Sequence, residues 1–214
     1  MKNILSITIF ILLIISTAVF AHQPQIVKGD LIITNPEVSR AFYDELTGQP
    51  RNYTIESPID FVLYVNLLVP SSNPNGRYSA LIRKDKQIIT KLDADRSKWV
   101  KFYEEFAGDY YVKGPEIKMK VPAGRYRITV FGNHNQGKYV LAVGEKEEWP
   151  IGETIKALAV LPRLKTDFFK SPALPLLITP MGIFYWIGFI LLLVILFIAW
   201  KLARVYNNRQ PRRK

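Results

Sequence analysis

An uninterrupted apolar stretch near the C-terminus constrains this chain more than any other feature. No charged residue occurs from Ser171 to Trp200, and residues 181–200 are almost wholly apolar. About 20 such residues form a helix long enough to cross the hydrocarbon core of a bilayer. A buried helix of this uniform apolarity would need a much larger protein around it. We therefore expect residues 181–200 to form one transmembrane helix.

The flanks of this stretch predict how the helix lies in the membrane. Aromatic rings stand near both of its ends, where amphipathic rings settle at the water interface, and only basic charges follow it. The side chains expected to anchor the helix are Tyr185, Trp186, Trp200, Lys201 and Arg204. Because basic flanks remain in the cytoplasm, we expect a single-pass protein of the cell membrane with residues 201–214 as a cytoplasmic tail. The lipid bilayer is then its first partner.

A second apolar stretch runs from Ile4 to Phe20, after one lysine. Val19 and Ala21 occupy the two positions that small residues hold before a signal-peptidase cut. We expect residues 1–21 to be a cleaved signal peptide, and an uncleaved signal anchor is the alternative. Both interpretations place the following domain outside the cytoplasm.

The net charge of +11 does not indicate nucleic acid as a partner. All 18 acidic groups lie in residues 22–180, where they nearly balance the basic ones, and much of the excess lies in the tail. A basic tail beside an apolar stretch is explained by the membrane. The chain also has no cysteine, which excludes disulfides, thiolate metal sites and cysteine nucleophiles.

Alternating apolar and polar residues predict strands throughout residues 22–150. The clearest strand is 59–69, in which every odd position is apolar. Similar patterns occur at 77–83, 116–121, 125–130 and 139–143, and further strands are expected near 25–34, 87–92 and 98–104. Many short strands separated by turn signals favour an all-β fold, an antiparallel, jelly-roll-like β-sandwich.

Two neighbouring strand patterns resemble a known family. Residues 121–130 read VPAGRYRITV, and residues 137–143 read GKYVLAV. This resembles the end of bacterial pre-peptidase C-terminal domains, secreted β-sandwich modules whose final hairpin has a Pro-Ala-Gly-x-Tyr strand followed by a Gly-x-Tyr-x-Leu strand. The resemblance covers residues 120–145 and implies a jelly-roll-like sandwich with an accessory, non-catalytic role. It carries over no functional residue, and this chain departs from the family in having a membrane anchor and no adjoining protease.

A juxtamembrane segment is expected at residues 151–180. Apolar residues recur with helical spacing within 152–169, and Pro162 should break or kink that short amphipathic helix. The helix either lies on the membrane surface or packs on one end of the sandwich. Three prolines in 172–180 then indicate a non-helical link to the membrane.

The two histidines suggest one candidate metal site. If cleavage follows Ala21, His22 becomes the N-terminus, and its amine and imidazole can chelate one copper ion. This layout is similar to that of copper-binding periplasmic β-sandwiches whose mature chain begins with His. His134, in a predicted turn, becomes a second ligand if that turn lies at the same end of the sandwich. The alternative is that neither histidine binds metal and the protein has no cofactor.

Residues 99–111 combine six aromatic side chains with three acids, a composition that suits a ligand or partner surface. The candidates are Trp99, Tyr103, Glu104, Tyr110 and Tyr111. The partner would be another envelope protein or a polysaccharide, and the alternative is that these aromatics are buried.

The sequence contains no recognisable catalytic constellation. Gly-x-Ser-x-Gly, His-Glu-x-x-His and Gly-rich phosphate loops are all absent. We therefore expect a membrane-anchored envelope β-sandwich with a binding or structural role and no catalytic activity. A copper-binding protein is the first alternative, and a polysaccharide hydrolase using acids such as Glu104 and Asp109 is the second.

Overall fold

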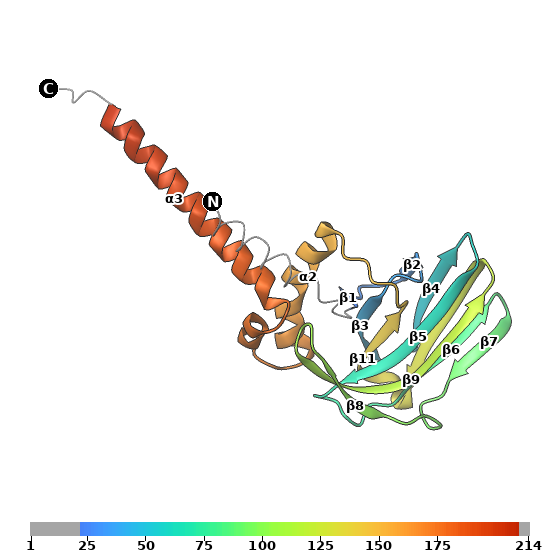
Figure 1. Cartoon of the computed structure of the whole chain (residues 1–214). Helices are drawn as coiled ribbons and strands as arrows, with labels where there is room; N and C mark the ends of the chain where they lie inside the picture. Colours follow the sequence, from blue (N-terminus) through green and yellow to red (C-terminus); the bar gives the residue numbers. More distant parts are fainter. Residues whose placement is uncertain (1–21, 210–214) are drawn as a thin grey trace, which may run out of the picture.

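The computed structural model describes residues 22–209, so the predicted signal peptide lies outside the described residues. Figure 1 shows a two-layered β body, a group of helical segments beside it, and the long helix α3 (Gly182–Arg209) projecting away. The predicted β-sandwich with a C-terminal apolar helix is confirmed.

The body consists of two sheets. The six-stranded sheet has the order β1 (Gln23–Ile26), β3 (Arg40–Thr47), β11 (Gln136–Val143), β5 (Phe61–Pro70), β9 (Asp109–Val121) and β8 (Val100–Glu104). The five-stranded sheet has the order β2 (Leu31–Thr34), β4 (Arg51–Ser57), β10 (Gly124–Gly132), β6 (Tyr78–Lys84) and β7 (Gln87–Leu92). Pairing is antiparallel except at two edges, where β1 runs parallel to β3 and β2 runs parallel to β4.

The final hairpin that the family resemblance implies does not form. β10 pairs with β4 and β6, whereas β11 pairs with β3 and β5 in the other sheet. The turn between them, which contains η1 (Asn133–Asn135), therefore carries the chain across the sandwich. Apolar and polar residues alternate in both strands because each strand turns one face to the core shared by the two sheets. This alternation arises whether or not the two strands pair with each other.

The core between the sheets is largely aliphatic and aromatic and contains one buried polar network. Tyr53, Tyr126 and Tyr139 are among its largest buried side chains. The hydroxyl groups of Tyr53 and Tyr139 donate to the carboxylate of Asp44 at 2.8 and 3.2 Å, and Arg51 Nε lies 2.8 Å from the same carboxylate. Buried hydroxyl groups need such partners, so Asp44 allows Tyr53 and Tyr139 to occupy the core.

A second core covers part of the outer face of the six-stranded sheet. It is formed by α2 (Ile151–Arg163), the π-helical turn η2 (Leu164–Phe168), η3 (Leu174–Ile178) and the start of α3. Its buried members are Ala41, Tyr43, Leu68, Ala107, Tyr111, Val140, Ala142, Ala157, Leu161, Leu164, Phe168, Phe169, Leu176 and Met181. The amphipathic helix thus packs on a face of the sandwich and not on its end. The proline-rich segment 172–180 is part of this packing and is not a loose link.

Pro162 lies in the last turn of α2, which ends at Arg163 and continues as the π-helical turn η2, and α3 compensates for the hydrogen bond that the proline cannot make. A proline has no N–H to donate to the carbonyl four residues earlier, which here belongs to Leu158. The hydroxyl of Tyr185, in the first turns of α3, donates to that carbonyl at 2.7 Å. The missing helical hydrogen bond is thereby replaced by a contact that joins α3 to α2.

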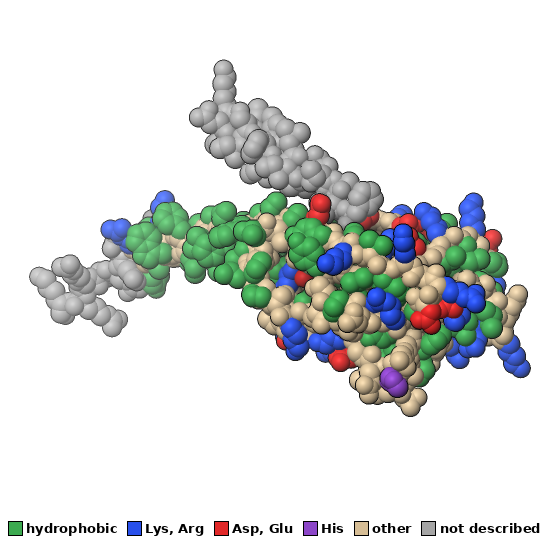
Figure 2. Space-filling model, turned by 90° about the horizontal axis from the view of Figure 1, so that it is seen from below, with side chains coloured by type: hydrophobic (Ala, Val, Ile, Leu, Met, Phe, Trp, Pro, Cys, Tyr) green, Lys and Arg blue, Asp and Glu red, His purple; other side chains and the backbone are tan. Residues whose placement is uncertain are grey.

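Helix α3 is long and apolar enough to cross a membrane from Gly182 to Tyr206. Figure 2 shows it as an apolar rod leaving a body on whose surface Lys, Arg, Asp and Glu are mixed. Trp186 and Trp200 are exposed on it, and Lys201 and Arg204 continue the helix beyond the predicted span of 181–200.

Candidate binding cleft

The outer face of the six-stranded sheet carries a cleft of about 360 Å³ beside the second core. Its floor consists of small and aliphatic side chains of β3, β5 and β11, namely Ala41, Leu68, Val140 and Ala142. Its walls and rim are formed by His22, Pro24, Ser39, Tyr43, Tyr64, Asn66, Phe102, Glu104, Phe106, Ala107, Tyr111, Lys113, Glu145, Glu147 and Leu161. A small apolar cavity with a few polar groups is the usual form of a ligand site.

The cleft exists because α2 covers only part of the sheet. Ala41 and Ala142 leave space above β3 and β11, and Leu161 of α2 closes one side. The turn between β8 and β9 closes another side with Phe106, whose ring stacks on Trp149 with 5.2 Å between centroids. The uncovered strip of sheet between these two walls is the floor.

Carboxylates outnumber cationic groups around the cleft. Glu104, Glu145 and Glu147 line it together with one lysine, Lys113. The carboxylate of Glu145 pairs with Lys118 at 2.6 Å, and the ammonium group of Lys113 pairs with Glu116 at 2.8 Å. These ion pairs hold the charged ends of Glu145 and Lys113 near the rim. This balance gives the cleft an acidic rim above an apolar floor.

Glu104 also shapes the wall of the cleft. Its carboxylate accepts hydrogen bonds from the backbone N–H groups of Phe106 and Ala107, at 2.8 and 2.9 Å. Burial raises the pKa of Glu104, and these two hydrogen bonds act in the opposite direction. The side chain therefore holds the β8–β9 turn while it lines the cleft.

His22 lies in the cleft, with its Nδ1 atom 2.5 Å from the hydroxyl oxygen of Ser39. Burial, assisted by the charge of Lys113, lowers the pKa of this imidazole from 6.5 to about 4. The ring is therefore neutral at pH 7, as metal coordination requires.

His134 does not lie near His22. His134 is in the turn before β11, where Gln136 is paired with Thr47 at one end of β3. His22 precedes Gln23, which is paired with Arg40 at the other end of β3. The two histidines are thus separated by the length of that strand, about 23 Å at 3.3 Å per residue. Within residues 22–209, no three His, Cys, Asp or Glu side chains are grouped to hold a metal ion.

The aromatic residues expected to form one surface at residues 99–111 lie in different environments in the structure. Tyr111 is buried, and its hydroxyl lies 2.8 Å from that of Tyr43 on the cleft wall. Trp99 packs against the inner core and donates from Nε1 to the carbonyl of Ala94 at 3.0 Å. Tyr103 is exposed and does not line the cleft.

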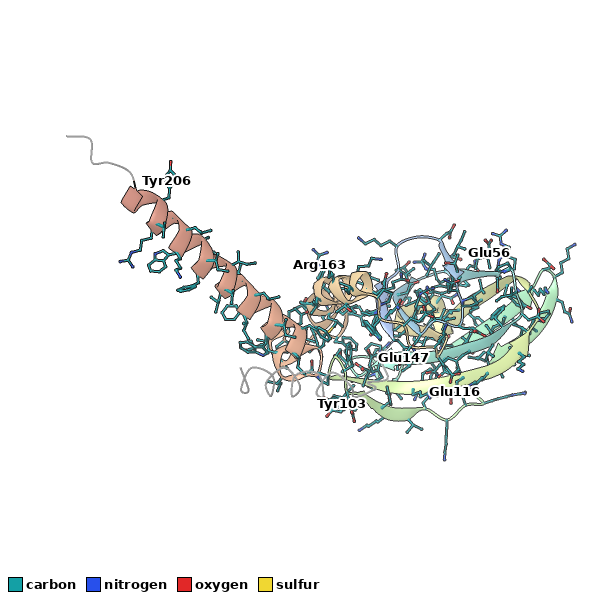
Figure 3. The ribbon with its side chains drawn as sticks, turned by 45° about the horizontal axis from the view of Figure 1, so that its top comes forward. Glu56, Tyr103, Glu116, Glu147, Arg163 and Tyr206 are labelled. Carbon is teal, nitrogen blue, oxygen red and sulfur yellow. The ribbon has the colours of Figure 1, made fainter. Side chains whose placement is uncertain are left out.

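The ring of Tyr103 lies 4.6 Å from the ring of Tyr110, which is exposed as well. In Figure 3, Tyr103 and Glu147 lie on the side of the body nearer to α3, and Glu56 lies toward its far end.

Glu104 and Asp109, the two acids considered for hydrolysis, are both engaged in contacts that stabilise the fold. Asp109 forms a buried ion pair with Lys165 at 2.6 Å, with both side chains at most 5% exposed. Glu104 caps its own turn, as described above. Neither carboxylate faces the other across an open groove.

Sequence reasoning missed several lining residues, including Asn66, Glu145 and Glu147. One signal was present, because both faces of strand 59–69 are rich in apolar residues and thus indicate a second covered face. Asp60 and Asn66 are the two polar residues of that stretch, and the side-chain amide of Asn66 donates to the carbonyl of Pro115 at 3.1 Å.

Comparisons with known proteins give weak matches only. No family model matches the chain, and neither does any curated protein. Among solved structures, the pre-peptidase C-terminal domain of a collagenase from Bacillus anthracis is 10% identical, with a TM-score of 0.35, and the match covers 55% of this chain and 95% of that chain. A beta-glucosidase from Paenibacillus barengoltzii is 7% identical, with a TM-score of 0.26 over 59% of this chain and 13% of that chain. The first match is of the class that residues 120–145 resemble, and neither match bears on the cleft.

Proposed function

We propose that this protein is a membrane-anchored binding module of the cell envelope, without catalytic activity, whose ligand enters the cleft on the six-stranded sheet. The observation that carries the proposal is the combination of an apolar floor, formed by Ala41 and Ala142, with an acidic rim. The basic residues after the apolar part of α3 support a cytoplasmic tail and a body on the outer side.

The cleft suits a ligand with an apolar body and a cationic group. The floor removes an apolar body from water, and the carboxylates of Glu145 and Glu147 favour a positive charge at the mouth. A basic or aromatic segment of another envelope protein has this chemistry. A neutral polysaccharide would leave the acidic rim without a role, and a nucleic acid would be repelled by it.

Phenethylammonium is a minimal probe of this chemistry, and phenylacetate is its matched control with the same ring and the opposite charge. The full chain, placed in lipid nanodiscs and labelled with carbon-13 in its alanine methyl groups, would be titrated with each. We expect the ammonium compound to shift the methyl signals of Ala41 and Ala142, which line the cleft, and phenylacetate to have little effect. Equal responses to both compounds, or none at these methyl groups, would refute the proposal.

Variants extend this test to the rim. Glu145→Gln combined with Glu147→Gln should weaken binding of phenethylammonium by roughly tenfold, because two carboxylate charges are lost and Lys118 no longer has Glu145 as its ion-pair partner. Glu56→Gln is the matched control, since Glu56 pairs with Arg125 on the other sheet, 3.1 Å away. Loss of affinity in the control would contradict the assignment to the cleft.

Copper binding is a second candidate, favoured by the neutral imidazole of His22 in the cleft. It requires cleavage after Ala21, so that the terminal amine and the imidazole together bind the ion. Mature protein should then bind Cu²⁺, and one extra residue before His22 should abolish binding. Unchanged binding after this extension would eliminate the N-terminal chelate.

A further inference from the structure

Helix α2 carries two apolar stripes on opposite sides. Ala157, Leu161 and the following Leu164 are buried toward the six-stranded sheet. Ile151 and Ile155, one turn apart on the opposite side, are 80% and 61% exposed. A helix on the surface of a water-soluble body usually turns a polar face outward, so the outer stripe needs an explanation.

The segment before α3 exposes two further large apolar side chains. Leu174 and Ile178 of η3 are 73% and 90% exposed. Ile151 and Ile155 belong to α2 and Leu174 and Ile178 belong to η3, and both elements are hydrogen-bonded to the first turns of α3. We call these four side chains the collar. Lys170 and Lys156, which pairs with Glu153 at 2.6 Å, are exposed near it in the sequence. Aliphatic side chains accompanied by lysines are typical of segments that lie at a lipid surface.

The collar is held at a fixed position relative to α3. The hydroxyl of Tyr185 bonds to Leu158 of α2, and the indole N–H of Trp186 donates to the carbonyl of Leu177 at 3.1 Å. The turn into α3 is tight, because a Cβ on Gly182 would lie 2.4 Å from that same carbonyl oxygen. The collar therefore cannot swing freely about the end of the helix.

The length of α3 places the collar at the membrane boundary. Its uncharged part, Gly182–Trp200, spans about 28 Å at 1.5 Å per residue, close to the roughly 30 Å of a bilayer's hydrocarbon core. If this part fills the hydrocarbon core, Gly182 lies at the outer boundary, and the residues just before it lie among the headgroups.

We propose that the collar formed by Ile151, Ile155, Leu174 and Ile178 is embedded in the outer headgroup region of the bilayer, so that α2 lies between the six-stranded sheet and lipid. Continuity with the apolar surface of α3 identifies lipid as the occupant. The proposal rests on the membrane anchoring proposed above. One stripe of α2 packs on a face of the sandwich, and in this proposal the other stripe meets the membrane, which is one of the two roles considered from the sequence.

Single-cysteine labelling tests this directly, because the natural chain has no cysteine. The environment-sensitive dye NBD would be attached at Ile155→Cys or Ile178→Cys in the full chain. The protein would be placed in vesicles of phosphatidylcholine and phosphatidylglycerol with a doxyl quencher near the headgroup. Ile88→Cys is the matched control, since Ile88 is 57% exposed on β7 of the other sheet. Leu192→Cys, with a mid-chain quencher, reports on the span itself.

We expect roughly threefold stronger quenching and blue-shifted emission at Ile155 and Ile178 compared with Ile88. Quenching at Leu192 combined with water-like signals at the collar would overturn the collar and leave the anchor intact. Absence of quenching at Leu192 would overturn the anchor itself. Blue-shifted collar signals without lipid quenching would show that protein, such as a second copy, covers the collar, and would also refute the proposal.

Discussion

The buried ion pair between Lys165 and Asp109 offers the sharpest test of how the body is joined to its helical segments. It links η2 to the start of β9, and Lys165 also donates to the carbonyl of Gly108 at 2.9 Å. Lys165→Met removes the charge and keeps much of the side-chain volume. Because Asp109 then remains buried without a counter-ion, we expect a loss of about 3–5 kcal/mol in the free energy of unfolding.

The loss should depend on pH. Burial raises the pKa of Asp109, and Lys165 is the group that opposes this shift. Without Lys165 the folded-state pKa rises further, while the unfolded-state pKa is unchanged. The folded state then binds the extra proton over a wider pH range, so stability falls as pH rises through that range, by up to about 1.4 kcal/mol per pH unit. Lys165→Met should therefore be less damaging at pH 5 than at pH 8.

Urea unfolding of the full chain in nanodiscs, followed by tryptophan fluorescence, measures both effects. Lys156→Met is the matched control, because Lys156 contacts Glu153 at the same 2.6 Å but is largely exposed. It should cost no more than about 1 kcal/mol. Asp109→Leu combined with Lys165→Met should recover most of the stability, since no charge is left buried. The reasoning would be refuted if the double variant were as unstable as Lys165→Met, or if Lys165→Met lowered the free energy of unfolding by less than about 1 kcal/mol.

Three further predictions concern single contacts. Tyr185→Phe leaves the carbonyl of Leu158 without its donor and should cost about 1–2 kcal/mol in the same urea assay, with an unchanged unfolding free energy contradicting it. Gly114→Ala places a Cβ 2.4 Å from the ring of Trp99, so it should lower stability by about 1–3 kcal/mol and shift tryptophan emission; unaltered emission would argue against the contact. The lowered pKa of His22, about 4, means that the folded state binds fewer protons than the unfolded state between pH 4 and 6.5, so stability should fall as pH drops through that range. An imidazole NMR titration with a midpoint near 6.5 would contradict this.

Much of the core between the sheets was predictable because one buried face imposes a period of two, although β4 was missed despite the alternation of Tyr53 and Ile55. The strands expected at 87–92 and 139–143 correspond to β7 and to most of β11. β3 was missed because Ala41 and Tyr43 face the second core while Phe42 and Leu46 face the first, which hides the alternation.

Contacts between segments that are distant in the sequence leave no periodic pattern by which they could be predicted. A turn sequence such as that at 133–135 specifies a change of direction but not whether the next strand joins the same sheet. Lys165 and Asp109 are 56 residues apart, and nothing in either local sequence indicates the other. The cleft is harder still to predict, since it depends on how much of the sheet α2 leaves uncovered.

The cleft and the anchor share residues, and this restricts how the protein can work. Phe106 lines the cleft, and its backbone carbonyl accepts a hydrogen bond from the N–H of Met181, next to the start of α3. Leu161 lines the cleft from the same helix whose Leu158 carbonyl receives Tyr185. A flexible linker would isolate ligand binding in the cleft from the transmembrane part of α3. Here the cleft wall and the start of α3 are parts of the same packed second core. A ligand that displaces Phe106 or Leu161 must therefore disturb the contacts that position α3.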